Sequence, residues 1–406
     1  MKELSEVLQD WEAVIGLEIH TELTALDTKM FCNCKLSHDD EPNANVCPVC
    51  LGLPGALPVP NKKAIESIVK AGLATNCEIQ RHSMFYRKHY FYPDLPKAFQ
   101  TSQYDLPLCY EGYVDIEAEG QTRRIGITRI HIEEDAGKLG HEEGCTRIDY
   151  NRCGVPLIEI VTEPDFRSSA EVHAFLEQLR TTLLYTGVSN CRMEEGSMRC
   201  DVNLSLREGE DAPFGTRTEM KNIASMSATV RAIEYEQKRQ AKLLDKGEVI
   251  TQDTLRWDDE RGVNYAMRSK EDAHDYFYFP EPDIMPIVVS EEWLERIRAS
   301  IPELPRARRA RYMAEYSLPE YDADFITGEK AFADLFDACV SHGSDPKAVS
   351  NWIMSDVSRL LNERGLAPEA IPFTPERFSR LLALVDGGKI SRTAGSRARS
   401  RASMPS

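Results

Sequence analysis

Acidic and histidine side chains alternate with apolar side chains in four short segments of the chain. The segments are Leu17-Glu18-Ile19-His20, Arg129-Ile130-His131-Ile132-Glu133, Asp201-Val202-Asn203-Leu204 and Arg217-Thr218-Glu219-Met220-Lys221. Successive side chains of a β-strand point to opposite faces, so each segment would bury its apolar residues and collect its polar residues on the other face. One polar face is common in antiparallel strands, and any segment taken alone has that simpler explanation.

Taken together, the four segments collect more acid than a solvated face requires. Their carboxylates, with that of Glu134 directly after the second segment, are Glu18, Glu133, Glu134, Asp201 and Glu219. Clustered carboxylates repel one another unless a cation lies among them, and oxygen ligands with one possible imidazole suit Mg²⁺ or Mn²⁺ better than zinc. Carboxylate-held Mg²⁺ commonly serves substrate phosphates, so the pattern indicates ATP chemistry. The sequence has neither a G-x-x-x-x-G-K-[ST] loop nor G-x-G-x-x-G after a predicted strand, so nucleotide binding would use an unrelated, sheet-based site.

Four of the eleven cysteines form two close pairs, Cys32-Asn33-Cys34 and Cys47-Pro48-Val49-Cys50. Four thiolates on two short turns predict a tetrahedral zinc site. Because the protein would fill every coordination position, the zinc would be structural rather than catalytic. The alternative is four unligated buried cysteines, which the close spacing disfavours. The other seven cysteines are scattered and are expected to be small buried side chains.

These residues would be positioned by an α+β domain. Period-two patterns dominate from Trp11 to about Val289 and predict a sheet, while helical patterns appear at residues 62–74, 169–184 and 227–244. After a Pro-rich stretch at residues 279–286, helices are predicted at 291–299, 330–340 and 347–363. We therefore expect a catalytic domain at 1–290 with a zinc knuckle at 32–50, an all-α helical domain at 291–395, and a disordered tail at 396–406.

Composition narrows the class of protein further. The 406 residues carry a net charge of −17, which argues against a chain that coats nucleic acid by bulk electrostatics. No apolar run is long enough for a membrane helix, and the N-terminus resembles neither a secretion signal nor a transit peptide, so we expect a cytoplasmic protein. Local RNA contact could come from Arg306, Arg308, Arg309 and Arg311 or from Arg392, Arg397, Arg399 and Arg401; a solvated helix face explains the first group equally well.

Several long strings in the chain are specific enough to compare with known families. They are Gly16 to His20, Cys47 to Gly55, Tyr90 to Lys97, His131 to Lys138, Asp149 to Ile160, Met198 to Asn203, Glu219 to Asn222 and Tyr278 to Asp283. These strings resemble the GatB subunits of the bacterial glutamyl- and aspartyl-tRNA amidotransferases. The resemblance covers residues 11 to 395. It implies a cradle-shaped first domain with an antiparallel sheet related to glutamine synthetase and guanidino kinases, followed by a helical domain. The family has a third, tail domain that grips the tRNA elbow; residues after Gly395 do not resemble it, and we expect the chain to lack it.

The resemblance also implies a reaction. The protein would use ATP to phosphorylate the side-chain carboxylate of misacylated Glu-tRNA(Gln) or Asp-tRNA(Asn). Ammonia from glutamine, released by a separate amidase (A) subunit, would then give the amide, with a small C subunit between the two. By their positions in the matched strings, Glu18, His20, Glu133, Glu134, Asp201 and Glu219 are expected around Mg²⁺. Lys88 and Lys221 would contact phosphate or carboxylate, and Asn203 and Asn222 would orient substrate or cap turns.

Two further features of the sequence involve aromatic residues. Phe277 occupies a position where the family has arginine between two tyrosines. The aromatic string Phe85-Tyr86 and Tyr90-Phe91-Tyr92 is expected mainly to form hairpin core, with stacking on a terminal adenosine as the less favoured alternative.

Two other hypotheses remain open from the sequence. The chain could be a non-catalytic, zinc-bearing scaffold that positions tRNA for a partner amidase. It could also be a stand-alone carboxylate–amine ligase acting on a small molecule, which the family resemblance disfavours.

Overall fold

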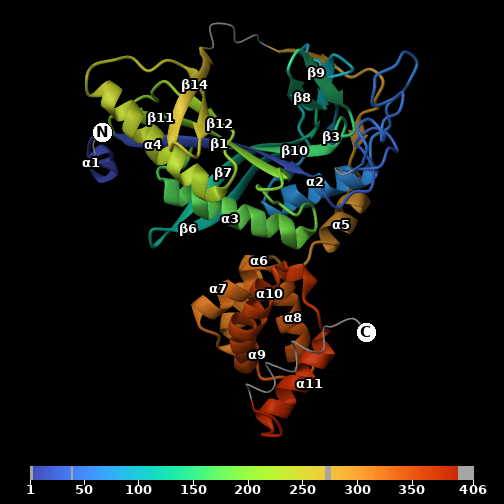
Figure 1. Cartoon of the computed structure of the whole chain (residues 1–406), viewed down its shortest axis with the longest axis vertical. Coiled ribbons are helices and arrows are strands. Elements are labelled where there is room, and N and C mark those ends of the chain that lie inside the picture. Colours follow the sequence, from blue (N-terminus) through green and yellow to red (C-terminus); the bar gives the residue numbers. More distant parts are fainter. Residues whose placement is uncertain (1–2, 38–39, 270–275, 392–406) are drawn as a thin grey trace. The chain divides into compact units, whose positions relative to one another are not determined.

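The structure is a computed structural model that describes residues 3–37, 40–269 and 276–391. The chain forms two compact units that divide between Ile301 and Pro302, whereas the sequence predicted a boundary near residue 290 (Figure 1). The tail expected at residues 396–406 and the arginines near it lie outside the described residues.

The first unit is an α+β domain. Its strands are β1 (Glu12–Glu22), β2 (Glu78–Ile79), β3 (His82–Ser83), β4 (Tyr86–His89), β5 (Phe99–Ser102), β6 (Cys109–Ala118), β7 (Gln121–Glu134), β8 (Lys138–Glu142), β9 (Cys145–Asp149), β10 (Pro156–Thr162), β11 (Met198–Arg207), β12 (Thr218–Lys221), β13 (Asp253–Asp258), β14 (Val263–Ser269), β15 (Phe277–Pro280) and β16 (Ile287–Val288). Its helices are α1 (Leu4–Asp10), α2 (Lys62–Ala74), α3 (Ser169–Thr186), α4 (Met226–Leu244) and α5 (Glu291–Ala299).

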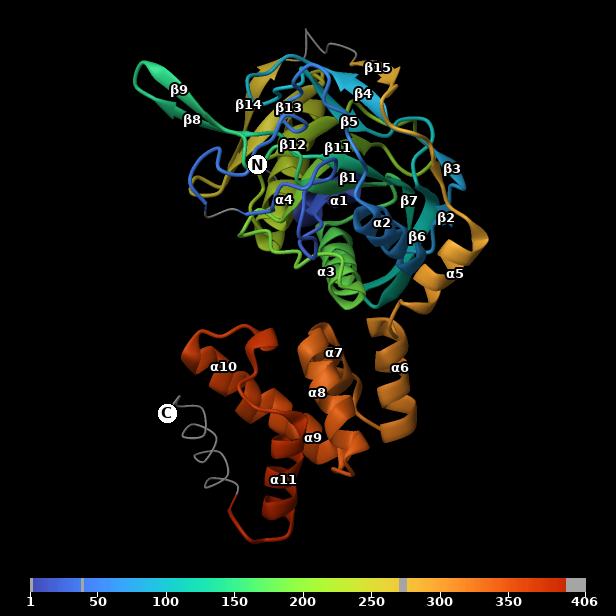
Figure 2. The same ribbon diagram turned by 90° about the vertical axis from the view of Figure 1, so that its right-hand side faces the viewer.

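One large sheet organises this unit, with the strand order β14-β13-β12-β11-β1-β10-β7-β6-β2. Neighbouring strands are antiparallel except β12 and β13, which are parallel. Smaller sheets order β15-β4-β5, β16-β3 and β8-β9. Figure 2 shows the β8–β9 hairpin projecting from the rest of the unit.

Helices α2, α3 and α4 pack against one face of the large sheet, where they contact β6, β7 and β11 (Figure 1). The apolar members of the alternating segments, such as Leu17, Ile130 and Val202, are buried in the core between them. Side-chain oxygens of Asn61, Ser168 and Ser225 cap the first turns of these helices and satisfy backbone N–H groups there. All three helices lie within two residues of the predicted positions.

The second unit is built, in its described residues, from helices alone. They are α6 (Pro305–Tyr316), α7 (Glu320–Gly328), α8 (Lys330–Ser341), α9 (Pro346–Trp352), the π-helical turn η2 (Ile353–Val357), α10 (Ser358–Arg364), the 3₁₀ turn η3 (Pro368–Ala370) and α11 (Pro375–Asp386). The single helix predicted at 347–363 is interrupted by η2. Within this turn the Ser355 hydroxyl donates to the Asn351 carbonyl at 2.5 Å.

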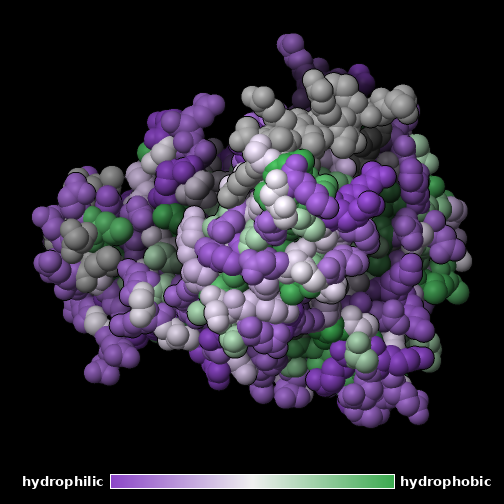
Figure 3. Space-filling model, turned by 90° about the horizontal axis from the view of Figure 1, so that it is seen from below, coloured by the Kyte–Doolittle hydropathy of each residue, from purple (hydrophilic) through white to green (hydrophobic). Residues whose placement is uncertain are grey.

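Across the described ranges, every helix is too short or too polar to span a lipid bilayer. On the face drawn in Figure 3, hydrophobic residues appear only as small separate patches among hydrophilic ones.

Candidate functional site

The predicted polar residues meet on the face of the large sheet opposite the buried apolar residues. His20 on β1 lies directly opposite Glu159 on β10, and Glu159 lies opposite His131 on β7. On the other side of β1, Glu18 lies opposite Asp201 on β11. Five neighbouring strands, from β12 to β7, therefore contribute to one continuous polar surface.

Three side chains on this surface form a compact candidate metal site. His20, Glu133 and Glu159 each offer a ligand atom, and these atoms lie within 4.8 Å of one another. His20 Nε2 is 3.4 Å from Glu159 Oε2 and 3.8 Å from Glu133 Oε2. A divalent ion about 2 to 2.5 Å from each ligand needs ligand atoms no further apart than this, so the group fits Mg²⁺ or Mn²⁺.

The buried His131 lies beside His20, Glu133 and Glu159. The pKa of His131 shows how strongly the two carboxylates favour a positive charge. Its Nε2 is 3.4 Å from Glu133 Oε1 and 3.4 Å from Glu159 Oε2, while its Nδ1 is buried and has no hydrogen-bond partner among the described residues. Burial alone would lower the pKa of His131, but the charge of Glu159 and the contacts with Glu133 raise it to about 9.

The same contacts act on the two carboxylates. Despite burial, His131 holds the pKa of Glu133 below its usual range, and His131 with His20 holds that of Glu159 well below. Two buried negative charges remain, and they require either an imidazolium or a bound cation.

The acids Glu18, Asp201 and Glu219 have polar partners within the protein. Lys221 Nζ lies 2.6 Å from Asp201 Oδ2 and 2.9 Å from Glu219 Oε1. Asn203 donates to Glu18 Oε1 at 3.1 Å. Burial, followed by the charges of Glu159 and Glu219, raises the pKa of Glu18. Glu18, Asp201 and Glu219 thus share the polar surface with the metal group but lie outside the group itself.

Strands β4 and β5 close the site over Glu133. Lys88 Nζ is 4.0 Å from Glu133 Oε1, Gln100 Nε2 is 3.3 Å from Glu133 Oε2, and the Ser102 hydroxyl donates to Glu133 Oε1 at 3.1 Å. Burial lowers the pKa of Lys88, but the Glu133 charge outweighs it and raises that pKa overall. Lys88 is therefore a cation that faces the candidate metal site.

Glu134 and Asn222 do not join the other predicted site residues. Because adjacent strand residues point to opposite sides, Glu134 leaves the polar surface and pairs with Lys97 and the Thr101 backbone N–H. There it lines a separate cavity of about 220 Å³ that Cys32 and Cys50 also line. Asn222 follows β12 in a left-handed conformation (φ 65°) and is exposed, as a turn residue would be.

The four clustered cysteines converge as a metal site requires. The sulfurs of Cys32, Cys34, Cys47 and Cys50 lie within 4.8 Å of one another, and the Cys47 backbone N–H donates to Cys50 Sγ at 3.1 Å. Burial raises the pKa of Cys34 to about 11, whereas the Cys32 thiol, by hydrogen bonding, lowers that of Cys50 to about 5. Thiols this close cannot all ionise without a cation, and four thiolates suit zinc.

A buried lysine lies beside this cysteine cluster. Lys29 is fully buried, its Nζ lies 3.8 Å from Cys50 Sγ, and it donates to the Tyr150 carbonyl at 3.1 Å. Its charge contributes to lowering the pKa of Cys50. A zinc ion with four thiolates carries a net charge of about −2, so a buried cation here offsets part of it.

Sequence reasoning did not single out Glu159. The signal was present, because Glu159 is one acid inside the apolar run Leu157-Ile158-Glu159-Ile160 of β10. A run of this kind reads as a strand buried on both faces, where a carboxylate persists only with a partner. That partner became visible only when the register placed Glu159 between His20 and His131.

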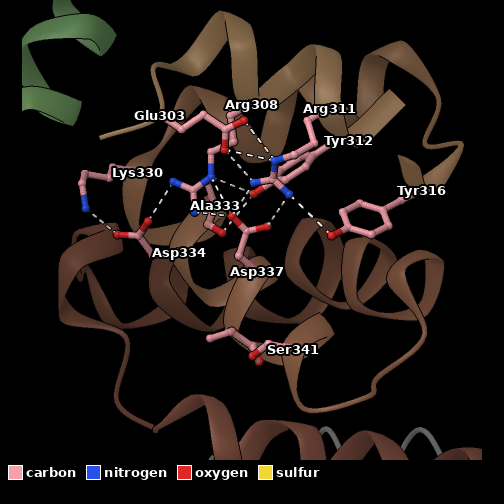
Figure 4. A network of polar contacts seen from close by, with 11 residues as sticks. Glu303, Arg308, Arg311, Tyr312, Tyr316, Lys330, Ala333, Asp334, Asp337 and Ser341 are labelled. Atoms are coloured by element: carbon pink, nitrogen blue, oxygen red, sulfur yellow. Dashed lines mark hydrogen bonds and ion pairs between the residues drawn. The ribbon is translucent and has the colours of Figure 1, made fainter. Parts of the chain in front are cut away.

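The arginines of α6 have structural partners (Figure 4). Arg308 is buried, with Nη1 2.8 Å from Asp334 Oδ1 and Nε 2.9 Å from Asp337 Oδ2. Arg311 contacts Glu303 at 2.7 Å and Asp337 at 2.9 Å. Acids of the same unit therefore neutralise these two arginines, which favours a structural role over RNA contact.

Phe277 lies away from the metal group. It pairs in register with His89 on β4, and the two rings are 5.9 Å apart. Strand alternation puts this pair on the side of β4 opposite Lys88. The predicted aromatic string is divided between core and surface, since Phe85 is buried in the core while Phe91 and Tyr92 are exposed.

Comparison with known proteins agrees with this picture. Residues 13–295 match the family described as the GatB/GatE catalytic domain, and residues 334–398 match the GatB domain. The chain is 57% identical to the aspartyl/glutamyl-tRNA(Asn/Gln) amidotransferase B subunit of Caldicellulosiruptor saccharolyticus, over 95% of this chain and 81% of that protein.

Proteins with the same name show similar values in other organisms. Identity is 54% with the protein of Symbiobacterium thermophilum, over 94% of this chain and 79% of that protein. It is 52% with the protein of Carboxydothermus hydrogenoformans, over 95% and 81%. The residues of the candidate metal site, His20, Glu133 and Glu159, fall inside the matched catalytic domain, and the chain therefore belongs to the GatB family of aspartyl/glutamyl-tRNA amidotransferases.

Proposed function

We propose that this chain is the amidotransferase component that activates the side-chain carboxylate of misacylated Glu-tRNA(Gln) or Asp-tRNA(Asn) with ATP, so that ammonia can convert it to the amide. The products would be Gln-tRNA(Gln) or Asn-tRNA(Asn) for translation. The observation that carries the proposal is the group of His20, Glu133 and Glu159, in which one imidazole and two buried carboxylates offer ligand atoms within 4.8 Å of one another on a polar sheet surface.

The architecture supports this reading at the level of domains. We infer a cradle of the glutamine synthetase and guanidino kinase type at residues 1–290, because a broad antiparallel-dominated sheet presents its polar face to ligands. The helical domain, expected from residue 291, would begin at Pro302, where the second compact unit starts. Residues 32–50 would be a structural zinc knuckle held by Cys32, Cys34, Cys47 and Cys50.

Two substrate anions must approach each other at this surface. His20, Glu133 and Glu159 would hold Mg²⁺, which when bound supplies positive charge against the repulsion between phosphate and carboxylate. Lys88 lies beside Glu133 and is placed to contact a phosphate or the substrate carboxylate. Lys221 holds Asp201 and Glu219 in place, and Asn203 orients Glu18.

The proposed reaction balances in two steps. A carboxylate oxygen of the aminoacyl group attacks the terminal phosphorus of ATP, and the bond from that phosphorus to the leaving ADP oxygen breaks. Ammonia nitrogen then attacks the acyl carbon of the acyl phosphate, releasing phosphate and leaving the amide. The ammonia would come from glutamine hydrolysed by an amidase (A) subunit, with a small C subunit completing the complex.

The test uses the chain assembled with its partner subunits. We expect Glu133→Gln to lower ATP-dependent conversion of Glu-tRNA or Asp-tRNA by at least about 100-fold, because it removes a candidate metal ligand whose charge cannot be replaced. Glu177→Gln on the exposed side of α3 is the matched control and should leave the rate unchanged. Size-exclusion chromatography checks that both variants still assemble.

Two outcomes would contradict the proposal. An unchanged rate in an assembled Glu133→Gln complex would favour a non-catalytic, zinc-bearing scaffold that positions tRNA. Amide formation from free glutamate, ATP and ammonium without tRNA would instead indicate a stand-alone ligase.

A further inference from the structure

The small sheet β15-β4-β5 presents one of its faces to the candidate metal site. Lys88 on β4 lies directly opposite Gln100 on β5 and Tyr278 on β15, so these three side chains share a face. Gln100 and Lys88 both reach Glu133. The face that carries Tyr278 is therefore continuous with the polar surface of the large sheet.

Tyrosines cover this face to an extent that core packing does not explain. Tyr104 stacks on Tyr278 with ring centroids 4.2 Å apart and an interplanar angle of 18°. Tyr90 and Tyr276 form a second pair at 5.6 Å. Tyr104 is 55% exposed and Tyr276 is 51% exposed, whereas the neighbouring Phe85 is 1% exposed. Exposed aromatic rings gathered beside a polar site mark a surface for a ligand with an apolar, flat part.

Positive charge lies next to these rings. Lys88 Nζ is 4.8 Å from the Tyr276 ring centroid. Arg129 on β7 belongs to the same polar surface, since it lies in register opposite Val161, two residues after Glu159. Flat rings with adjacent cations fit a nucleotide, because the base can stack while the cations meet its phosphate.

We call the surface formed by Tyr90, Tyr104, Tyr276 and Tyr278 the tyrosine face. Its exposure to solvent indicates which kind of nucleotide it can bind. At the opposite end of the polar surface, a cavity of about 260 Å³ is lined by Glu18, Asn203, Phe214 and Arg217 among others, and it can take a small nucleotide. The tyrosine face is instead an open surface, which a macromolecular chain end can reach. Building on the proposed function, we propose that Tyr104 and Tyr278, with Tyr90 and Tyr276, stack on the 3′-terminal adenosine of the aminoacyl-tRNA and thereby hold its aminoacyl group beside Glu133.

The test compares two forms of uncharged tRNA, one complete and one shortened by its terminal adenosine. Binding of each to the assembled complex is measured by fluorescence anisotropy for the wild type, Tyr104→Leu and Tyr104→Phe. Loss of one base stack should weaken binding of complete tRNA to Tyr104→Leu by roughly 5- to 150-fold. Binding of the shortened tRNA should be the same for Tyr104→Leu and wild type. Tyr104→Phe keeps the ring and should bind complete tRNA normally.

The controls of this binding test, and the results that would contradict it, differ from those that test the proposed function. Tyr321→Leu removes an exposed tyrosine from α7 and should change neither affinity. The proposal is overturned if Tyr104→Leu binds complete tRNA as wild type does, or weakens both tRNAs equally. It is also overturned if Tyr104→Leu leaves tRNA binding intact and raises only the KM for ATP, since the base would then be that of ATP. Because binding is measured without turnover, an inactive wild-type complex would count against the proposed function alone.

Discussion

At the residue scale, the site depends on which carboxylates share the polar surface. Glu133 and Glu134 are neighbours in sequence, yet Glu133 reaches His20 while Glu134 pairs with Lys97 on the other side of β7. Glu159 takes the place that the sequence had suggested for Glu134. Adjacent acids in a strand therefore belong to different sites, and only one of them faces the candidate metal group.

This distinction gives a prediction for two substitutions. Glu159→Gln should lower ATP-dependent amide formation by at least about 100-fold, because it removes a ligand oxygen charge from the metal group. Glu134→Gln should lower it far less, and mainly through reduced stability, because Glu134 serves the pair with Lys97. Initial rates and thermal unfolding of both variants check this. Equal losses of rate in two equally stable variants would contradict the assignment.

A second prediction concerns the buried Lys29. Lys29→Met should speed zinc release to a chelator by several-fold, since it removes a cation that offsets the charge of the thiolates. Lys35→Met, at an exposed position in the same loop, is the control and should release zinc at the wild-type rate. Zinc release is followed with a coloured chelator. Identical rates in all three proteins would show that Lys29 only fills space.

Residue types and spacing predicted much of the site from the sequence. The cysteine pairs converge, and Glu18, His20, Glu133, Asp201 and Glu219 share one surface because strand alternation is a local rule. Glu159 and the pairing of Lys221 with Asp201 could not be read in this way. Both depend on which strands are neighbours and in what register, and a single sequence does not state that.

At the element scale, the network of α6 and α8 stabilises the helical unit. Arg308→Met should destabilise the protein by about 1 to 3 kcal/mol, because it leaves Asp334 and Asp337 without their buried partner. Arg380→Met at an exposed position of α11 is the control and should change stability by less than about 0.5 kcal/mol. Urea unfolding measures both. If Arg308→Met were as stable as the control and lost tRNA affinity instead, the RNA-contact interpretation would be restored.

The same network predicts a pH dependence. Burial opposes ionisation of Asp334, but Lys330 and Arg308 outweigh it and hold its pKa below the usual range. A carboxyl whose folded pKa is depressed adds stability above the unfolded pKa of about 3.9, and that stability is lost as the pH falls through the folded value. The melting temperature should therefore fall less steeply below pH 4 in Asp334→Asn than in wild type. Exposed Asp386→Asn should follow wild type, and equal slopes in all three would contradict this account.

Helix positions were predictable at this scale because caps and period are local. Helices α2 and α5 begin and end where the pattern predicted, and α3 and α4 differ by no more than two residues. The π-helical turn η2 was missed, because the helical period of residues 347–363 does not mark a one-turn change in the backbone hydrogen-bond pattern. The pairing of β15 with β4 was also beyond local reasoning, since the chain between them is long.

At the scale of the whole molecule, the central claim is that separate strands assemble one divalent-cation site on the polar face of the sheet. His20 comes from β1, Glu133 from β7 and Glu159 from β10, so only the complete sheet brings them together. Displacement of any one of these strands would therefore separate the three candidate ligands. Binding of a divalent cation by the folded chain therefore tests most directly whether His20, Glu133 and Glu159 form a metal site.

The decisive measurement is a Mn²⁺ titration followed by electron paramagnetic resonance on the zinc-loaded chain. We predict one tight site in the wild type and in Glu177→Gln, and a loss of affinity of about 10- to 100-fold or more in Glu159→Gln and in His20→Ala. Wild-type Mn²⁺ affinity in a folded Glu159→Gln protein would contradict the account.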